Sequence, residues 1–157
     1  MAGTSPAMTK HKDVAPKLTV GEIEAHFARD FPQGDFGPKG LFKIERVGMG
    51  SALVRMKASD KVLRPGGTVS GSSMMMLADA TMYVAILASI GWVPLAVTTS
   101  LNINFLRKPQ AGDVLADCNL LKLGKRLTVG EIAVRSDGEE EMVAHSVATY
   151  SIPPQGS

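Results

Sequence analysis

Residues 64–91 read RPGGTVSGSSMMMLADATMYVAILASIG, and this stretch decides the fold that we predict for the chain. A glycine-rich turn at 64–67 leads through Thr68 and Gly71 into a long run that is almost wholly apolar. One charge, Asp79, interrupts that run. An ionised carboxylate among methionines costs several kcal/mol unless it is paired, so Asp79 needs a specific role. We expect this stretch to form the buried central helix of a small α+β domain, with its amino end and its lone acid as two halves of an active site.

The size and composition of the chain fit a single globular domain. Its 157 residues are enough to bury roughly two-thirds of the unfolded surface. Hydrophobic residues make up 45% and charged residues 20%, which argues against global disorder. The net charge of +2, with basic residues spread along the chain, gives no indication of nucleic-acid binding. The single cysteine, Cys118, cannot form an internal disulfide and offers no metal site, so we expect it in a strand of the core.

The first part of the chain bears on its location. Residues 1–18 lack an apolar segment, so we expect them to form a flexible tail before a single domain at 19–153. No secretory signal is visible, and the first arginine is Arg29, whereas a mitochondrial presequence is usually rich in arginine. We therefore expect a cytoplasmic protein.

A membrane helix has to be considered, because residues 74–97 are very apolar. Asp79, Gly91 and Pro94 interrupt this stretch and leave only 80–90 as a continuous helical run. Such a run spans about 16 Å, well short of a bilayer core of about 30 Å. We therefore predict a buried helix and no membrane contact.

Local signals predict the elements on either side of the central helix. Thr19 and Glu22 form a capping box that begins a helix reaching about Asp30, and the Phe31-Pro32 pair ends it. Turn signals and alternating apolar residues predict six strands, at residues 41–47, 51–58, 95–106, 113–123, 127–135 and 141–152. We expect one mainly antiparallel sheet with the helices on one of its faces.

This arrangement also predicts self-association. A helix that is apolar nearly all round must be enclosed, and a curved sheet that grips it is a good physical solution. One such unit still exposes an edge strand or one side of the helix, so we expect a dimer. Within the strand at 95–106, alternation predicts that Thr99, Leu101, Ile103 and Phe105 share one face.

Three sequence motifs, taken in order, resemble the hotdog-fold thioesterases. They are Thr68-Val-Ser-Gly-Ser72, Leu77-Ala-Asp79 and the segment SLNINFLRKP at 100–109. The most similar branch is the phenylacetate-degradation (PaaI-like) group, related to the 4-hydroxybenzoyl-CoA thioesterases, and the likeness spans about residues 40–152. The resemblance implies a sheet wrapped around the long helix, assembly as dimers and often as tetramers, and hydrolysis of acyl-CoA thioesters. It implies no separate cofactor, since CoA is part of the substrate.

The resemblance also assigns residues to the site. In that family the segment before the helix reads His-Gly-Gly, or has Gln or Asn in place of His, and the helix acid lies nine residues after it. Here Ser70 takes the place of the histidine, Gly71 and Ser72 take the places of the glycines, Asp79 takes that of the acid, and an upstream Asn of some members falls on Arg64. Thr98 or Thr99 sits where some members place a hydroxyl group that orients water.

General chemistry supports these roles. The amino end of a helix offers free N–H donors and a positive dipole, which suit a thioester carbonyl that becomes an oxyanion. A carboxylate in an apolar cleft is a competent general base or nucleophile. Gly71 and Asp79 are eight residues apart, about 12 Å along one helix, so they cannot both reach one carbonyl carbon. A site that uses both must take Gly71 from one subunit and Asp79 from its partner.

The same residues have structural interpretations. Asp79 could be a buried acid that is hydrogen-bonded to the sheet, Gly71 a plain helix-entry glycine, and Ser70 or Ser72 an N-cap. Arg64 suits a phosphate or carboxylate group, but it equally suits an exposed loop.

Further residues are candidates for substrate binding. Met75, Met82 and Tyr83 could line an acyl pocket, although apolar helix residues of this kind are more often core. Five basic residues suit the phosphates of a CoA tail, or are solvated strand ends: Arg107, Lys108, Lys122, Lys125 and Arg126. The histidines His26 and His145 lack the spacing of a catalytic triad.

Two functions remain open at this point. The main hypothesis is a hotdog acyl-CoA thioesterase that acts through Asp79 as a homodimer or a dimer of dimers. The alternative is a binding module of the same fold that holds acyl-CoA or another acyl ligand without turnover, which the serine at position 70 motivates. A hotdog hydratase or dehydratase needs a histidine in the helix region, and none lies between His26 and His145.

Overall fold

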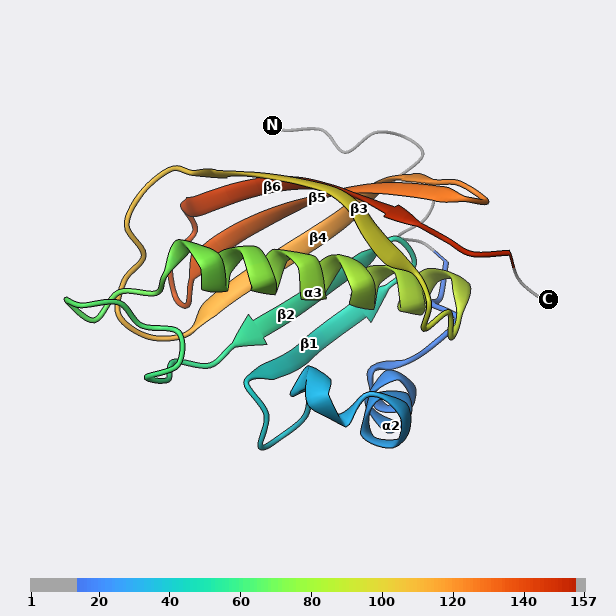
Figure 1. Ribbon diagram of the computed structural model, residues 1–157, viewed down its shortest axis with the longest axis horizontal. Coiled ribbons are helices and arrows are strands. Elements are labelled where there is room, and N and C mark those ends of the chain that lie inside the picture. Colours follow the sequence, from blue (N-terminus) through green and yellow to red (C-terminus); the bar gives the residue numbers. More distant parts are fainter. Residues whose placement is uncertain (1–13, 155–157) are drawn as a thin grey trace.

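A curved sheet of six strands holds a long helix across one face in the computed structural model, which describes residues 14–154 (Figure 1). The strand order is β1-β2-β4-β5-β6-β3, and every neighbouring pair is antiparallel. The strands are β1 (Phe42–Gly48), β2 (Ser51–Met56), β3 (Val97–Phe105), β4 (Val114–Leu123), β5 (Leu127–Ser136) and β6 (Met142–Ser151). All six predicted strands are confirmed, with ends that shift by a few residues. The strand β3 follows the helix in the chain, and among residues 14–154 it pairs with β6 alone, so its other side forms a free edge.

The central helix α3 (Gly71–Ile90) begins and ends at the residues that local signals indicate. Ser70 is its N-cap, and the Ser70 Oγ accepts a hydrogen bond from the Ser73 N–H at 3.1 Å. At the other end, the Gly91 N–H donates to the Leu87 carbonyl at 3.0 Å, and its φ of 100° suits a residue without a side chain. By length and composition α3 could cross a membrane, but 67% of its most apolar stretch of 18 residues is buried inside the fold.

The core lies between α3 and the inner face of the sheet. Leu77, Met82 and Ile86 of the helix are completely buried there. They face alternate strand residues that are also buried, among them Ala52, Val54, Met56, Ala116, Cys118, Ile132 and Val134. The prediction that Cys118 is a core strand residue is therefore confirmed, and burial raises the pKa of its thiol.

One side of α3 is not enclosed by the sheet. Met75 and Met76 are 42% and 44% exposed, and Ser72, one turn before them, is exposed as well. Asp79 follows on the same side at partial exposure. This stripe agrees with the expectation that one unit leaves an edge strand or one side of the helix exposed, because a single sheet can cover only part of the surface of a helix.

The N-terminal helix α2 (Val20–Asp30) covers the part of the structure where α3 ends (Figure 1). Its predicted capping box is confirmed, since the Glu22 N–H donates to the Thr19 Oγ1 at 3.2 Å and the Thr19 N–H donates to the Glu22 Oε1 at 3.0 Å. Its inner side buries Ile23 and Phe27. A short 3-10 helix, η1 (Pro32–Gly34), follows.

The predicted tail at 1–18 falls largely outside the described residues, which begin at 14. Of the part that is described, the backbone N–H groups of Lys17 and Leu18 donate to the Ala88 carbonyl at 2.7 and 3.4 Å.

Close packing between α3 and β5 generates a stability prediction. A methyl group added at Gly130 would lie 2.6 Å from the Met82 Sδ and 3.1 Å from the Leu120 Cδ2. Gly130→Val should therefore lower the free energy of unfolding by about 1–3 kcal/mol through overpacking, as measured by urea denaturation. Gly21→Ala is the control, because no atom lies within 4 Å of the added carbon and α2 gains a better helix former. Equal stability of the Gly130→Val variant and the wild type would contradict this packing.

Candidate active site

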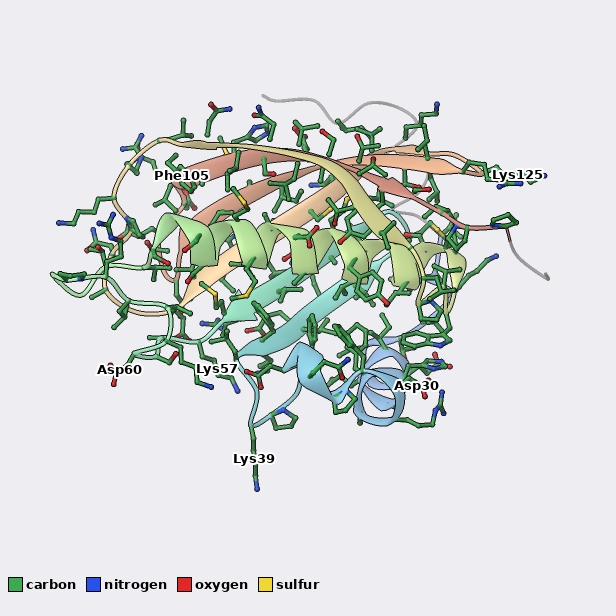
Figure 2. All side chains as sticks on the ribbon, viewed as in Figure 1. Asp30, Lys39, Lys57, Asp60, Phe105 and Lys125 are labelled. Carbon is green, nitrogen blue, oxygen red and sulfur yellow. The ribbon has the colours of Figure 1, made fainter. Side chains whose placement is uncertain are left out.

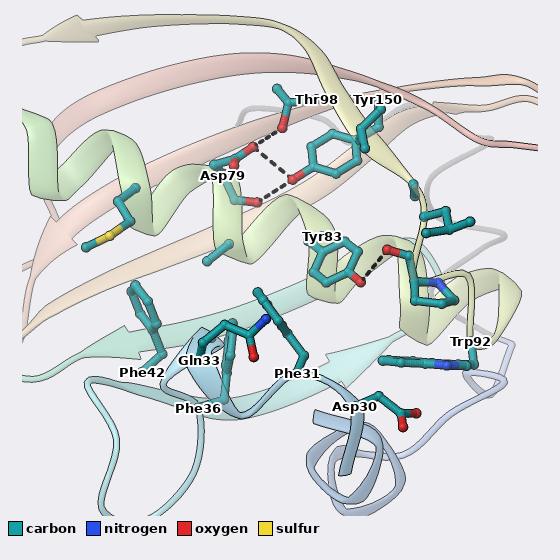
Figure 3. Close-up of a pocket in the computed structure, with 17 residues that line it drawn as sticks. Asp30, Phe31, Gln33, Phe36, Phe42, Asp79, Tyr83, Trp92, Thr98 and Tyr150 are labelled. Atoms are coloured by element: carbon teal, nitrogen blue, oxygen red, sulfur yellow. Dashed lines mark hydrogen bonds between the residues drawn. The ribbon is translucent and has the colours of Figure 1, made fainter. Parts of the chain in front are cut away.

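A cavity of about 710 Å³ lies beside the open stripe of α3 (Figure 3). Its walls come from α3, from the segment that includes η1, and from the residues that lead into β3. The chain contains five Phe, two Tyr and one Trp, and six of these eight line the cavity: Phe31, Phe36, Phe42, Tyr83, Trp92 and Tyr150. An aromatic and apolar lining of this kind suits an apolar ligand.

Asp79 lies in the wall of this cavity and is hydrogen-bonded to two hydroxyl groups from the sheet (Figure 3). The Thr98 Oγ1 donates to the Asp79 Oδ1 at 2.6 Å, and the Tyr150 hydroxyl donates to the same oxygen at 2.8 Å. Asp79 Oδ2 has no hydrogen-bond partner among residues 14–154. The acid is therefore held by the protein at one oxygen, and the other oxygen is left for a ligand or water.

A β-bulge in β3 decides which threonine contacts Asp79. Thr98 pairs with Tyr150 and Ser100 pairs with Thr149, so Thr99 is an extra residue between them. The Thr99 hydroxyl donates to the Thr149 carbonyl at 3.2 Å and does not line the cavity. Simple alternation, on which Thr99 was expected to share a face with Leu101, does not count this bulged residue, and it is Thr98 that pairs with Tyr150 and contacts Asp79.

Tyr150 is the residue at Asp79 that the sequence analysis did not identify. It lies in β6, is 3% exposed, and also has its hydroxyl oxygen 3.1 Å from the Asp79 backbone carbonyl. Burial, together with the nearby Asp79 carboxylate, raises the pKa of the tyrosine well above its usual value. Alternation along β6 could have placed Tyr150 on the inner face, but no local signal links it to a residue so far away in the chain.

Gly71 lies at the amino end of α3, next to the end of β3. A methyl group added there would be 3.1 Å from the Phe105 Cζ, so the aromatic ring lies against this glycine. Within the described part of the chain, the Gly71 N–H has no hydrogen-bond acceptor, as is usual in the first turn of a helix. Ser70 is occupied as the N-cap and also donates to the Ser73 Oγ at 2.7 Å, while Ser72 is exposed.

The predicted catalytic residues thus fall into two groups in one subunit. Asp79 and Thr98 are together in the cavity wall, and Gly71 and Ser70 are at the start of the helix two turns away.

The candidate residues for an acyl pocket are separated in the same way. Tyr83 lines the cavity, and its hydroxyl donates to the Pro94 carbonyl at 3.0 Å. Met82 does not line the cavity, because its side chain is fully buried between α3 and the sheet. Met75 is exposed beside the cavity and Met76 lines it instead.

The basic candidates lie at the two ends of the sheet. Lys125 is in the β4–β5 turn and Phe105 is at the end of β3, and Figure 2 shows them at opposite ends of the molecule. Lys122 and Arg126 accompany Lys125. The other group follows Phe105 or precedes α3 and consists of Arg64, Arg107 and Lys108, of which Arg107 pairs with Glu141 at 3.1 Å.

The two histidines within residues 14–154 do not line the cavity that contains Asp79. The ring of His26 stacks on Trp92 with the centroids 4.3 Å apart, and the Arg29 Nη2 donates to the His26 Nδ1 at 2.8 Å. His145 pairs with Glu131 at 3.2 Å on the sheet face away from α3. In residues 14–154 no cluster of three or more His, Cys, Asp or Glu side chains could hold a metal ion.

Comparison with known proteins gives related chains that cover most of this one. The family model of the thioesterase superfamily matches residues 66–143. A protein of Silicibacter sp. TM1040 that is assigned as a thioesterase is 43% identical, and its crystal structure aligns with a TM-score of 0.79 over 88% of this chain and 94% of that one. The phenylacetic acid degradation protein PaaI of Thermus thermophilus is 25% identical, with a TM-score of 0.61 over 71% and 93%. The 1,4-dihydroxy-2-naphthoyl-CoA hydrolase of Listeria monocytogenes is 28% identical over 110 residues, which are 70% of this chain and 89% of that one.

Proposed function

The chain belongs to the thioesterase superfamily and is a thioester hydrolase with the hotdog fold, and on this premise we propose that it hydrolyses an acyl-CoA through Asp79. The observation that carries the proposal is the position and the hydrogen bonding of this carboxylate. It lies in the wall of an apolar cavity with one oxygen bonded to two hydroxyl groups and the other unbonded within residues 14–154.

Two routes lead from this carboxylate to hydrolysis. As a general base, Asp79 takes a proton from water while the water oxygen bonds to the thioester carbonyl carbon; the C–S bond then breaks and the CoA thiolate receives the proton. As a nucleophile, Asp79 bonds to that carbon itself, expels the thiolate and forms a mixed anhydride that water hydrolyses. Both routes build negative charge on the carbonyl oxygen, and a free N–H group such as that of Gly71 would stabilise it.

The edge strand β3 supports a pairing of two subunits that would supply this N–H group. Most residues of β3 are exposed, and its outer edge has no partner strand in the described part of the chain. One end of the strand bonds to Asp79 through Thr98, and the ring of Phe105 at the other end lies against Gly71. Antiparallel pairing of two β3 strands therefore brings Gly71 of the partner subunit toward Asp79.

Side-chain direction narrows the register of this pairing. Residues that oppose each other in an antiparallel pair point to the same side of the sheet, and both Thr98 and Phe105 point toward the helix. Suppose that Thr98 opposes Phe105 of the partner subunit and that Thr99, as the bulged residue, has no opposite residue. Asn102 is then the middle residue of the paired segment and opposes Asn102 of the partner subunit. The Asn102 side chain then lies near its symmetry mate, with the Cα atoms about 4.5–5.5 Å apart.

The same pairing supports binding of a CoA tail by both basic groups. Within one subunit the two basic groups lie at opposite ends of the sheet (Figure 2). An antiparallel partner subunit runs in the opposite direction, so each end of one sheet lies beside the other end of its partner. The β4–β5 turn with Lys125 and Arg126 then lies on the same side of the dimer as Arg107 of the partner subunit. Basic side chains from both subunits would surround the phosphates of a CoA whose thioester reaches Asp79.

The cavity supports the binding of an apolar acyl group next to Asp79. One wall is formed by Phe31, Gln33 and Phe36, which precede the region that the family model matches. Phe31 is packed edge-on against Tyr83, with the ring centroids 6.4 Å apart, so the N-terminal segment and α3 form a continuous surface. We propose that this segment determines which acyl groups the enzyme accepts.

The catalytic role of Asp79 is tested by the variant Asp79→Asn. Its amide has almost the same shape but cannot accept a proton or attack a carbonyl carbon, so thiol release from a panel of acyl-CoAs should fall by about 10²-fold or more. Asp60→Asn, in the exposed loop before α3, is the matched control and should retain wild-type activity. A wild type that binds CoA but releases no thiol from any acyl-CoA would contradict the proposed function and favour the binding module.

The proposed pairing is tested by a disulfide between subunits. Asn102→Cys should cross-link into dimers under mild oxidation, because the expected Cα separation of about 5 Å suits a disulfide. The native Cys118 is fully buried and should not react. Val147→Cys, opposite Asn102 on β6 but inside the sheet of one subunit, is the control and should stay uncross-linked. A monomer in analytical ultracentrifugation at assay concentrations would rule out the shared site.

The role of the N-terminal wall is tested by Phe31→Ala. Loss of the ring leaves part of the acyl group without contact, so kcat/KM for the preferred acyl-CoA should fall about tenfold and the preference should move toward bulkier acyl groups. Leu121→Ala, which is 49% exposed and does not line the cavity, is the control for loss of an apolar side chain. An unchanged acyl preference would show that this wall does not contact the substrate.

A further inference from the structure

We propose that Tyr150 is a positioning residue which, together with Thr98, fixes the Asp79 Oδ1 so that the Oδ2 is the oxygen that reacts. This inference rests on the proposed catalytic role of Asp79. Both hydroxyl bonds end on the Oδ1, at 2.6 Å from Thr98 and 2.8 Å from Tyr150. Two donors on one oxygen make the two ends of the carboxylate chemically different.

The two donors form one unit because the sheet holds them side by side. Thr98 and Tyr150 are directly opposed on β3 and β6, and the bulge at Thr99 brings this pair into register. Tyr150 is also opposed to Thr128 on β5, so its strand is fixed on both sides. The hydroxyl groups therefore come from a rigid surface, whereas Asp79 comes from the helix that packs on it.

Tyr150 can serve only as a donor in this position. Its pKa is raised by burial and by the Asp79 carboxylate, so the phenol keeps its proton over the range in which an enzyme of this kind works. The same hydroxyl is 3.1 Å from the Asp79 backbone carbonyl as well as 2.8 Å from the Oδ1. This double contact fixes the side-chain rotamer of Asp79 relative to its own backbone, which leaves the Oδ2 with one direction in the cavity.

Few other ionisable groups act on Asp79. The cavity wall contributes Asp30 from α2 and Tyr83 from α3, and no lysine or arginine within residues 14–154 lines it. Asp30 is paired with Arg29 at 3.0 Å, which lowers its pKa, and the Tyr83 hydroxyl donates to the Pro94 carbonyl instead. Thr98 and Tyr150 are thus the side chains that hold the Asp79 carboxylate in this wall.

The test compares Tyr150→Phe with two further variants. Without the phenol hydroxyl, the Asp79 side chain can leave its single rotamer, so kcat for the preferred acyl-CoA should fall about tenfold while KM changes less than about twofold. Thr98→Val should lower kcat in the same way. Tyr83→Phe removes a hydroxyl from the same cavity that does not touch Asp79, and it should leave the Asp79 rotamer unchanged.

A second measurement keeps the inference separate from the proposed function. The χ1 rotamer of Asp79 can be measured by NMR couplings without any substrate, on signals identified by their loss in Asp79→Asn. The wild type and Tyr83→Phe should show one rotamer, and Tyr150→Phe should show an average over several. If the wild type has no activity but the rotamer averages in Tyr150→Phe, the proposed function fails and the positioning role stands. If Tyr150→Phe is folded and its kcat and Asp79 rotamer both match the wild type, the positioning role is wrong.

Discussion

An acid in an apolar helix has to exchange its bound water for donors from the protein, and this requirement organises the structure around Asp79. The donors are two hydroxyl groups from neighbouring strands, which reach the carboxylate because the helix lies directly on that part of the sheet. Their bonds join the helix to the edge of the sheet at the place where the cavity opens. Holding a reactive group on rigid elements preserves its geometry better than holding it on a loop.

A second constraint comes from the helix itself. An α-helix is stiff, and the separation of eight positions between Gly71 and Asp79 keeps the N–H group and the carboxylate too far apart to act on one carbonyl. The free edge at β3 allows a second subunit to supply the missing half of the site. One end of β3 contacts Asp79 and the other contacts Gly71, so an antiparallel copy places its own Gly71 end beside Asp79. On this proposal the exposed edge, which is ordinarily a liability for aggregation, becomes the means by which a complete site forms.

Local parts of the fold could be predicted because their causes lie within a few residues. The capping box at Thr19, the N-cap at Ser70 and the end of α3 at Gly91 each depend on hydrogen bonds over three or four positions. The inner residues of β2, such as Val54, follow from strict alternation. Thr99 did not follow this rule, because a bulge adds one residue to a strand and leaves no clear mark in its pattern.

The sequence by itself determined that an acid occupies the middle of an apolar helix, that a glycine opens this helix, and that six strands form one mainly antiparallel sheet against it. These features depend on periodicity and on short-range capping. The tertiary structure decided that Thr98 is the threonine that holds Asp79, that Tyr150 joins it, and that an aromatic cavity lies beside them. Asp79 and Tyr150 are separated by 71 residues, and their contact depends on strand register and on how the helix packs across the sheet. No local pattern encodes that register, because it results from the combined packing of all the strands.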